Sequence, residues 1–447
     1  MPANSDFELN APRALKKENV MADNRQQQLR QAIAKRRDEV RQLILDVVGI
    51  ASVTNDEGAV QDRFEQAMRE RNLMVDRWVA SKEEIAPYTL HVGEQDVYDN
   101  RPNLVGVRPG NEPNSGRSIM LQGHVDTVDS GDPSLWTKNP TGEYVESEGR
   151  IYGRGALDMK SGVVTNLFAV QVLDDIGVKL GGDVLVAASV GEEDGGLGAM
   201  STILRGYKAD AVVITEPTSR NLVIAHGGSL VFRLTVTGRS AHGATRHRGV
   251  SALEKFIPIF QDLLAWEEER TRTLSHPLFD HMEDKFPISV GVVKSGTWAS
   301  TVPEILVAEG RLGFLPAESI QEMQAATAAR IDTIVQQDDW LREHPPVLEW
   351  FGGQFDSAEV SPEEPIAQAV AKAHEAATGS PITMTAISAG LDMRLFTEIG
   401  HMPTVTYGAG SVSEGNAHGP DEWIELDEVL GAIETIALTV LDWCGEA

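Results

Sequence analysis

Short runs of apolar residues recur along this chain, and several of them end close to a histidine or a carboxylate. The runs are continuous rather than alternating, which is typical of strands buried on both faces. They occupy residues 103–107, 118–121, 184–190, 211–215 and 403–407. Helix-forming stretches separate them, at residues 24–48, 62–71 and 161–176. This alternation predicts an α/β fold with a mostly parallel central sheet flanked by helices.

The middle of the chain has a different pattern. Residues 230–237 alternate between apolar and polar side chains, which indicates a sheet with one solvated face. A capping box at Ser251 and Glu254 opens a helix. We expect its apolar side to contain Leu253, Phe256, Ile257, Phe260 and Leu264. Two further strands, a second helix and a closing strand at 346–351 complete an α+β unit.

We therefore predict three parts. Residues 1–23 are polar and mixed in charge, and we expect a loose arm there. Residues 24–228 and 358–447 form a discontinuous α/β domain, and residues 229–357 form an inserted α+β domain.

Charge and cysteine content narrow the class of protein. The 447 residues include 39 Lys and Arg against 67 Asp and Glu, a formal net charge of −28. A surface this acidic repels nucleic acid and anionic membranes, so we expect neither as a partner. The single cysteine, Cys444, cannot form an intrachain disulfide, and no apolar run resembles a signal peptide or a membrane span. These features predict a cytoplasmic protein.

Histidines and carboxylates follow the predicted strands or lie in glycine-bounded turns. In α/β sheets, ligands bind beyond the carboxyl ends of the strands. A buried charge is costly there unless it is paired or bound to a metal, so a network of ion pairs is the alternative to a metal site. Imidazole and carboxylate ligands without thiolate suit Zn²⁺, with Co²⁺ or Mn²⁺ as alternatives. The candidate residues are His124, Asp158, Glu192, Glu193, Glu216 and His418.

The residue types also suggest separate roles. Two metal ions need a carboxylate that bridges them, and Asp158, held in a tight turn, is the best candidate. Asp126 lies two residues after His124 and is expected to orient its imidazole. Adjacent side chains diverge, so one of Glu192 and Glu193 can bind metal while the other accepts a proton from water.

Six motifs carry a resemblance to one family. In chain order they read GHVDTV, YGRGALDMKSG, GEEDGG, TEPT, GRSAHG and AHGPDEW. Through them the chain, from about residue 40 to its end, resembles di-zinc amidohydrolases. That family includes aminoacylase, acetylornithine deacetylase, succinyl-diaminopimelate desuccinylase and glutamate carboxypeptidase.

The resemblance implies a role for each motif residue. One Zn²⁺ is held by His124, Asp158 and Glu216, and the other by Asp158, Glu193 and His418. Glu192 matches the general base. The inserted domain is implied to be a ferredoxin-like lid through which two chains form a homodimer.

Two residues of the inserted domain are implied to meet the substrate. His242 matches a histidine that stabilises the oxyanion from the opposite subunit, and Arg311 matches an arginine that holds a substrate carboxylate. On the residues alone, His242 fits a turn histidine equally well, and Arg311 fits a surface arginine on a strand. His226, His247 and Lys160 match no ligand position and are interpreted as structural.

The implied activity is hydrolysis of the amide bond of an N-acyl amino acid by a metal-activated water, with Glu192 as the base. A dipeptidase or carboxypeptidase with the same metals is the closest alternative, and a non-catalytic binding protein is a more distant one. The chain departs from many relatives at Ser300-Thr301 and at residues 388–392, both near the substrate in the family. The departures concern the identity of the substrate rather than the metal chemistry.

Overall fold

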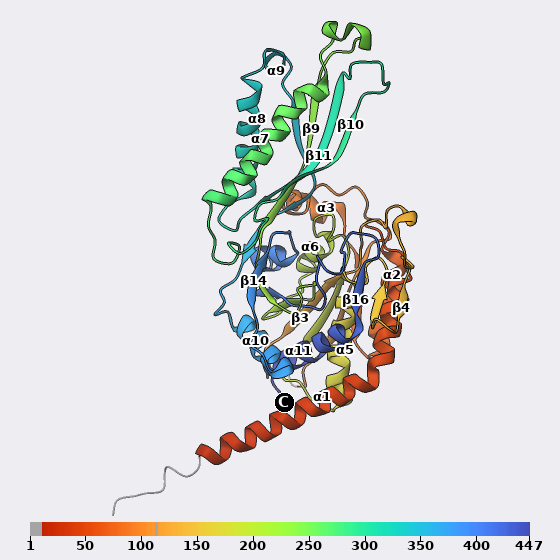
Figure 1. Ribbon diagram of the computed structural model, residues 1–447. Helices are drawn as coiled ribbons and strands as arrows, with labels where there is room; N and C mark the ends of the chain where they lie inside the picture. The colour runs from red at the N-terminus through yellow and green to blue at the C-terminus, as the bar shows by residue number, and fades with distance from the viewer. Residues whose placement is uncertain (1–10, 112–114) are drawn as a thin grey trace, which may run out of the picture.

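The computed structural model describes residues 11–111 and 115–447, with side chains from Asn24 onward (Figure 1). Within them, the largest sheet has nine strands in the order β1-β2-β6-β3-β7-β15-β8-β13, with β14 paired to β8. The strands are β1 (Met74–Val79), β2 (Pro102–Arg108), β3 (Ile119–His124), β6 (Val184–Ser189), β7 (Val212–Ile214), β8 (Leu222–His226), β13 (Ala358–Glu359), β14 (Met384–Ile387) and β15 (Thr404–Thr406).

The centre of this sheet is parallel. Strands β6, β3, β7 and β15 run side by side in one direction, while β1, β2, β8 and β13 pair antiparallel towards the two edges. Every residue of β3 and β6 is buried, which explains the continuous apolar runs at residues 119–121 and 184–188 within them. The predicted fold class, a mostly parallel central sheet flanked by helices, is confirmed.

Helices cover the sheet. Helices α5 and α11 pack on each other and on β3, α1 and α10 lie against α11, and α6 packs on β2 and β6. The helices of this part are α1 (Ala11–Val48), α2 (Gly58–Glu70), α3 (Lys82–Ile85), η1 (Ala86–Tyr88), α4 (Thr89–Val92), η2 (Pro133–Leu135), α5 (Lys160–Asp175), α6 (Leu197–Leu204), α10 (Pro365–Thr378), η4 (Leu395–Ile399) and α11 (Leu426–Cys444). A small sheet of β4 (Glu143–Val145), β5 (Arg150–Tyr152) and β16 (Trp423–Glu425) lies beside them.

The N-terminal helix begins earlier than the sequence pattern predicts. Helix α1 starts at Ala11 rather than near residue 24, because residues 11–23 are rich in Ala, Leu, Lys and Glu, which favour helix. Residues 1–10 of the predicted arm lie outside the described residues. The first half of α1 projects away from the rest of the chain (Figure 1). Among the helices described, none is both long enough and apolar enough to span a membrane.

Residues 228–355, which we call the four-stranded unit, project from one end of the nine-stranded sheet (Figure 1). Their strands, all antiparallel, lie in the order β10-β11-β9-β12. Along the chain the unit reads strand, helix, strand, strand, helix, strand, the ferredoxin-like arrangement. Its elements are β9 (Gly228–Thr237), η3 (Gly243–Arg248), α7 (Ala252–Thr273), β10 (Ile288–Ser295), β11 (Ile305–Phe314), α8 (Ile320–Val335), α9 (Asp339–Glu343) and β12 (Val347–Phe355).

The prediction of which apolar side of α7 is buried is mostly wrong. The buried apolar residues of the helix are Ala252, Phe256, Ile259 and Leu263. The expected residues Leu253, Ile257 and Leu264 are 42%, 43% and 37% exposed. The helix carries two apolar stripes at helical spacing, and only one of them can face its own sheet. A second apolar face therefore stays uncovered in the single chain.

Candidate metal centre

Three neighbouring strands bring four of the six candidate residues to one end of the large sheet. Strand β3 ends at His124, and its parallel neighbour β6 ends opposite it at Ser189, just before Glu192 and Glu193. On the other side of β3, strand β7 ends two residues before Glu216. The carboxyl ends of parallel strands lie at the same end of a sheet, so residues far apart in sequence meet there.

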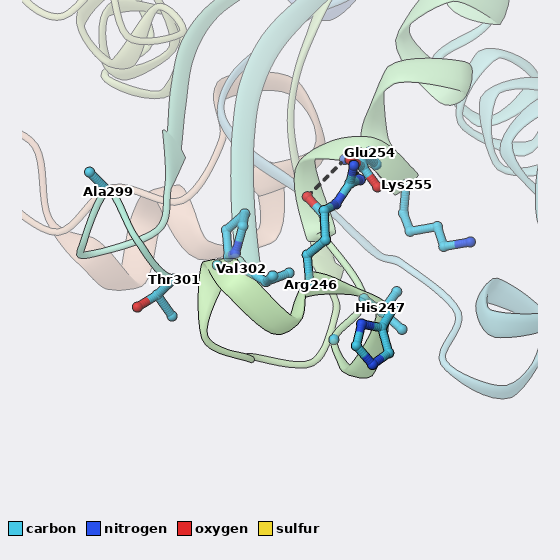
Figure 2. Close-up of a pocket in the computed structure, with 12 residues that line it drawn as sticks. Arg246, His247, Glu254, Lys255, Ala299, Thr301 and Val302 are labelled. Atoms are coloured by element: carbon cyan, nitrogen blue, oxygen red, sulfur yellow. Dashed lines mark hydrogen bonds and ion pairs between the residues drawn. The ribbon is translucent and has the colours of Figure 1, made fainter.

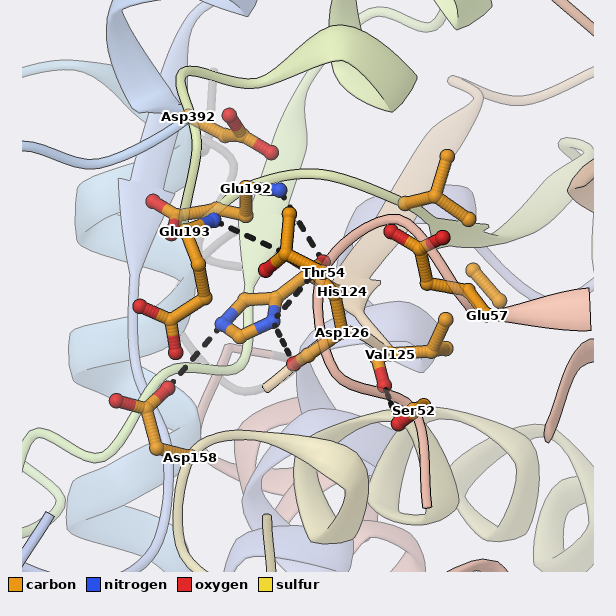
Figure 3. A network of polar contacts seen from close by, with 12 residues as sticks. Ser52, Thr54, Glu57, His124, Val125, Asp126, Asp158, Glu192, Glu193 and Asp392 are labelled. Atoms are coloured by element: carbon orange, nitrogen blue, oxygen red, sulfur yellow. Dashed lines mark hydrogen bonds and ion pairs between the residues drawn. The ribbon is translucent and has the colours of Figure 1, made fainter. Parts of the chain in front are cut away.

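Asp158 lies between two histidines. His124 Nε2 is 3.1 Å from Asp158 Oδ1 and 3.4 Å from Glu216 Oε1. His418 Nε2 is 3.4 Å from Asp158 Oδ2 and 3.1 Å from Glu193 Oε1. Candidate ligand atoms of His124, Asp158 and Glu193 all lie within 4.8 Å of one another (Figure 3). The structure thus brings together the five side chains that the sequence predicts, in two groups that share Asp158.

Asp126 holds the loop that carries the two glutamates. Its Oδ1 accepts a hydrogen bond from the main-chain N–H of Glu192, and its Oδ2 accepts one from that of Glu193, both at 3.1 Å (Figure 3). Thr54 also donates to Oδ2, at 3.2 Å. His124 Nδ1 lies 3.0 Å from the main-chain oxygen of Asp126 and 3.6 Å from its carboxylate. The shorter contact to the imidazole is therefore made by the main chain of Asp126 and not by its side chain.

The cluster holds an excess of negative charge. Burial alone would lower the pKa of His124, but the charge of Glu216 and hydrogen bonds with Asp126 and Asp158 raise it well above its ordinary value. Burial raises the pKa of Glu216 to about 7, and the nearby carboxylates of Asp158 and Glu193 act in the same direction. Hydrogen bonds to Asp158 and Glu193 raise the pKa of His418 to about 11. Such a group attracts added positive charge.

Glu192 differs from its neighbour. The two side chains diverge, and Glu193 points towards Asp158 (Figure 3). Burial raises the pKa of Glu192 well above its usual range, and the charges of Asp392, Glu216 and Glu193 act in the same direction. A buried carboxyl with a raised pKa beside a ligand cluster has the properties of a general base.

The turn that carries Asp158 depends on a glutamate that sequence reasoning missed. Glu422 Oε1 accepts hydrogen bonds from the main-chain N–H groups of Leu157, at 2.9 Å, and Asp158, at 3.1 Å. Its other oxygen pairs with Arg154 at 2.6 Å, and both side chains are buried. Arg154 and Glu422 each lie in a motif noted above, but nothing in the sequence pairs them. The peptide bond between Asp158 and Met159 is cis.

His242 and Arg311 lie elsewhere. His242 is exposed and is the N-cap residue of η3, where its Nδ1 accepts a hydrogen bond from the N–H of Ala244. The segment that contains η3, in green, lies at the tip of the four-stranded unit (Figure 1). Arg311, on β11, donates to Ser229 Oγ and to the main-chain oxygen of Ser388, both at 3.1 Å. Both acceptors are neutral, so neither of these hydrogen bonds neutralises the charge of Arg311.

Three further residues match no ligand position in the motifs: Lys160, His226 and His247. Lys160 is buried and donates to the main-chain oxygens of Val47, at 3.0 Å, and Ile50, at 2.7 Å. His226 is buried on β8, with Nδ1 2.9 Å from the oxygen of Gly227. His247 is exposed in η3 and lines a hollow of about 590 Å³ with Arg246, Glu254 and Lys255 (Figure 2).

The charges in that hollow are largely matched. Arg246 pairs with Glu254, and Lys255 pairs with Asp338 at 2.5 Å. The hollow is formed by residues 243–255 and 299–303 alone, so it belongs to the four-stranded unit and not to the group of histidines and carboxylates.

The donor set fits two divalent cations. Two imidazoles, three carboxylates and no thiolate converge, and the central carboxylate has one oxygen towards each histidine. This set of ligands suits Zn²⁺, and also Co²⁺ or Mn²⁺. The fold and the site together define a metal-dependent hydrolase of the α/β class.

Comparison with known proteins identifies the family. A family model described as "Peptidase family M20/M25/M40" matches residues 120–442, well over half of the chain, and the protein belongs to this family. It is therefore an enzyme that acts on linear amide bonds.

Individual relatives cover most of the chain. An N-formyl-4-amino-5-aminomethyl-2-methylpyrimidine deformylase from Halalkalibacterium halodurans is 29% identical over 367 residues, 78% of this chain and 84% of the relative. Two solved structures share the fold at 13% identity. A di-peptidase from Saccharomyces cerevisiae has a TM-score of 0.76, covering 94% of this chain and 98% of its own. A dinuclear metal-binding peptidase from Bacillus subtilis has a TM-score of 0.56, covering 91% and 98%.

Proposed function

We propose that this enzyme hydrolyses the amide bond of an N-acyl amino acid with the help of two Zn²⁺ ions, for which Co²⁺ or Mn²⁺ can substitute. The observation that carries the proposal is the sharing of Asp158 between two ligand groups. His124, Asp158 and Glu216 would hold one ion, and Asp158, Glu193 and His418 the other. Such ions would supply Lewis acidity, which would polarise the amide carbonyl and lower the pKa of a bound water.

The protein side chains then move the proton. Glu192 accepts it from the attacking water and returns it to the leaving amine. Asp126 fixes the main chain of Glu192 and Glu193 through two hydrogen bonds, so the base and the ligand keep their separate directions. His242 would stabilise the oxyanion. Because it is exposed at the tip of the four-stranded unit, it would act on the site of a second copy of the chain.

A homodimer is part of this proposal. The uncovered apolar stripe of α7 supports an interface through the four-stranded unit, the inserted domain of residues 229–357. The proposed compartment is the cytoplasm.

Arg311 supports a substrate that carries a carboxylate. Its guanidinium is half-buried, and its two acceptors, Ser229 and Ser388, are neutral. A guanidinium in such a place recognises a carboxylate through two parallel hydrogen bonds. The α-carboxylate of an N-acyl amino acid meets this requirement, and so does the C-terminus of a dipeptide, which keeps the dipeptidase or carboxypeptidase alternative open.

A substrate panel tests the proposal. The Zn-loaded enzyme is assayed with N-formyl, N-acetyl and N-succinyl amino acids beside dipeptides and a formamide that lacks a carboxylate. We expect the N-acyl amino acids to be cleaved with the highest kcat/KM and Arg311→Met to raise their KM by about tenfold or more. Preference for dipeptides would favour the alternative. Equal cleavage of the carboxylate-free formamide would contradict the role of Arg311.

A further inference from the structure

Arg394 is a buried arginine whose hydrogen-bond acceptors are all main-chain oxygens. It is 1% exposed. Its Nη1 donates to the oxygen of Leu391 at 2.7 Å, and its Nη2 donates to those of His91, at 3.0 Å, and Gly195, at 2.8 Å. The three acceptors belong to three segments: its own turn, helix α4, and the loop that carries Glu192 and Glu193. One guanidinium therefore joins segments that are far apart in sequence.

The loop from Gly191 to Gly196 is held at both ends. Asp126 binds the N–H groups of Glu192 and Glu193 at its start. Arg394 binds the oxygen of Gly195 near its end. Within the loop, Gly195 N donates to Glu192 O at 2.9 Å and Gly196 N to Gly191 O at 2.7 Å. Loss of the Arg394 contact would free the end of the loop that Asp126 does not reach.

The same arginine also reaches the four-stranded unit. Its guanidinium carbon lies 4.2 Å from the ring centroid of Phe355, the last residue of β12. The chain crosses between this unit and the large sheet twice. One crossing runs from β12 to β13, which pairs with β8 of the large sheet.

Main chains approach one another closely at this junction. A Cβ on Gly195 would come within 2.3 Å of Val92 O and 3.3 Å of the Cα of Gly353. A Cβ on Gly93 would come within 1.9 Å of Gly352 O. Helix α4, the loop and the end of β12 therefore pack backbone against backbone. These contacts leave little room for β12 to shift without displacing the loop.

We propose that Arg394 is a positioning residue that ties the loop of Glu192 to the junction between the large sheet and the four-stranded unit. It touches neither the ligand group nor the proposed substrate arginine in its own hydrogen bonds, and it acts through the main chain of Gly195. The inference rests on the proposed role of Glu192 as the base. Movement of the four-stranded unit during turnover would thereby reach the base.

The test uses Arg394→Lys in the full chain, with Arg270→Lys as the matched control. Arg270 is also buried, donates to a main-chain oxygen (Gly313, 2.9 Å) and packs on aromatic rings, but it also pairs with Glu318 at 2.6 Å, and all these contacts lie within the four-stranded unit. The measurements are metal content, kcat, KM and amide hydrogen exchange of residues 191–196.

We expect Arg394→Lys to keep two metal equivalents and to lower kcat by about tenfold to a hundredfold with a smaller change in KM. Exchange of residues 191–196 should be faster than in the wild type. Arg270→Lys should leave the kcat and this exchange unchanged. Wild-type exchange and kcat in Arg394→Lys, or equal effects in both variants, would overturn the proposal.

A second variant covers the case in which Arg394→Lys does not fold. Phe355→Leu leaves the three hydrogen-bonding partners of Arg394 in place and removes only the ring beneath the guanidinium. It should also speed exchange of residues 191–196, and unchanged exchange would refute the link to β12. If the wild type cleaves no N-acyl amino acid, the proposed substrate class fails, whereas metal content and exchange still decide the role of Arg394.

Discussion

Glu192 and Glu193 are neighbours in the chain, but their carboxylates have different surroundings. Glu193 is 3.1 Å from His418. Glu192 has the larger rise in pKa, caused first by burial and then by the charges of Asp392 and Glu216. A carboxylate with a raised pKa is, once ionised, the stronger base towards water, whereas a carboxylate beside an imidazole is suited to share a metal with it.

Exchange of each glutamate for glutamine separates these roles. Glu192→Gln should retain two metal equivalents while kcat falls by about 10²–10⁴-fold, since the general base is lost. Glu193→Gln should bind less metal. Elemental analysis and hydrolysis rates of the two variants check this. Hydrolysis by Glu192→Gln at the wild-type rate would show that the base is a different group.

His226 gives a prediction about stability and pH. Burial lowers the pKa of His226 to about 3, from an ordinary value of 6.5. Between these values the unfolded chain binds a proton that the folded chain does not, so stability falls as the pH drops below about 6.5. The loss is about 1.4 kcal/mol per pH unit, or about 2 kcal/mol at pH 5.

The measurement is urea unfolding of the wild type and His226→Gln at pH 7 and pH 5. The variant lacks this titration, so its free energy of unfolding should fall by about 2 kcal/mol less than that of the wild type over the interval. Equal losses in both proteins would mean that His226 does not titrate as its burial requires. The comparison uses the change with pH, so a uniform destabilisation of the variant does not affect it.

Single elements show where sequence reasoning succeeds and where it fails. The strands were predictable because burial on both faces leaves continuous apolar runs, and the meeting of His124, Glu193 and Glu216 was predictable because they follow these runs. The buried face of α7 was not, since two apolar stripes compete and only tertiary packing chooses. The contacts of Arg394 could not be predicted because its acceptors are main-chain oxygens, which every residue has.

The pairing of Arg154 with Glu422 was also hidden, since 268 residues separate them. Glu422→Gln removes the charge that offsets buried Arg154 and weakens the support of the Asp158 turn. We expect a loss of about 3 kcal/mol in the free energy of unfolding and weaker metal binding by about tenfold or more.

Glu425→Gln is the control from the same segment. Glu425 is 40% exposed and lies 3.5 Å from Arg150, so its loss should cost about 1 kcal/mol or less. Denaturant unfolding of the metal-free proteins and metal titration check both variants. Similar effects for the two glutamates would contradict the support of the Asp158 turn by Glu422.

At the scale of the whole molecule, the four-stranded unit carries an uncovered apolar stripe and the exposed His242. The division into a catalytic domain of residues 24–228 and 358–447 and an inserted domain stays a prediction, as does the homodimer. The division follows from the change of apolar pattern along the chain, whereas the homodimer follows from the position of His242: a histidine at the tip of the unit can serve catalysis only if that tip reaches the group around Asp158, and a second copy provides one.

Charges placed on the stripe test the dimer. Leu253→Glu combined with Ile257→Glu should give a monomer that keeps its metals but loses kcat by about tenfold to a thousandfold, because His242 no longer reaches a site. Sedimentation, metal content and hydrolysis rates give the three readouts. A wild type that is monomeric and fully active would contradict both the dimer and the role of His242.

Metal binding by the shared Asp158 cluster is the claim on which the rest depends. The most direct measurement is anomalous scattering at the zinc edge from crystals of the Zn-loaded enzyme. We predict two peaks, one bounded by His124, Asp158 and Glu216 and the other by Asp158, Glu193 and His418. Absence of a peak there, in crystals whose zinc content has been verified, would contradict the account.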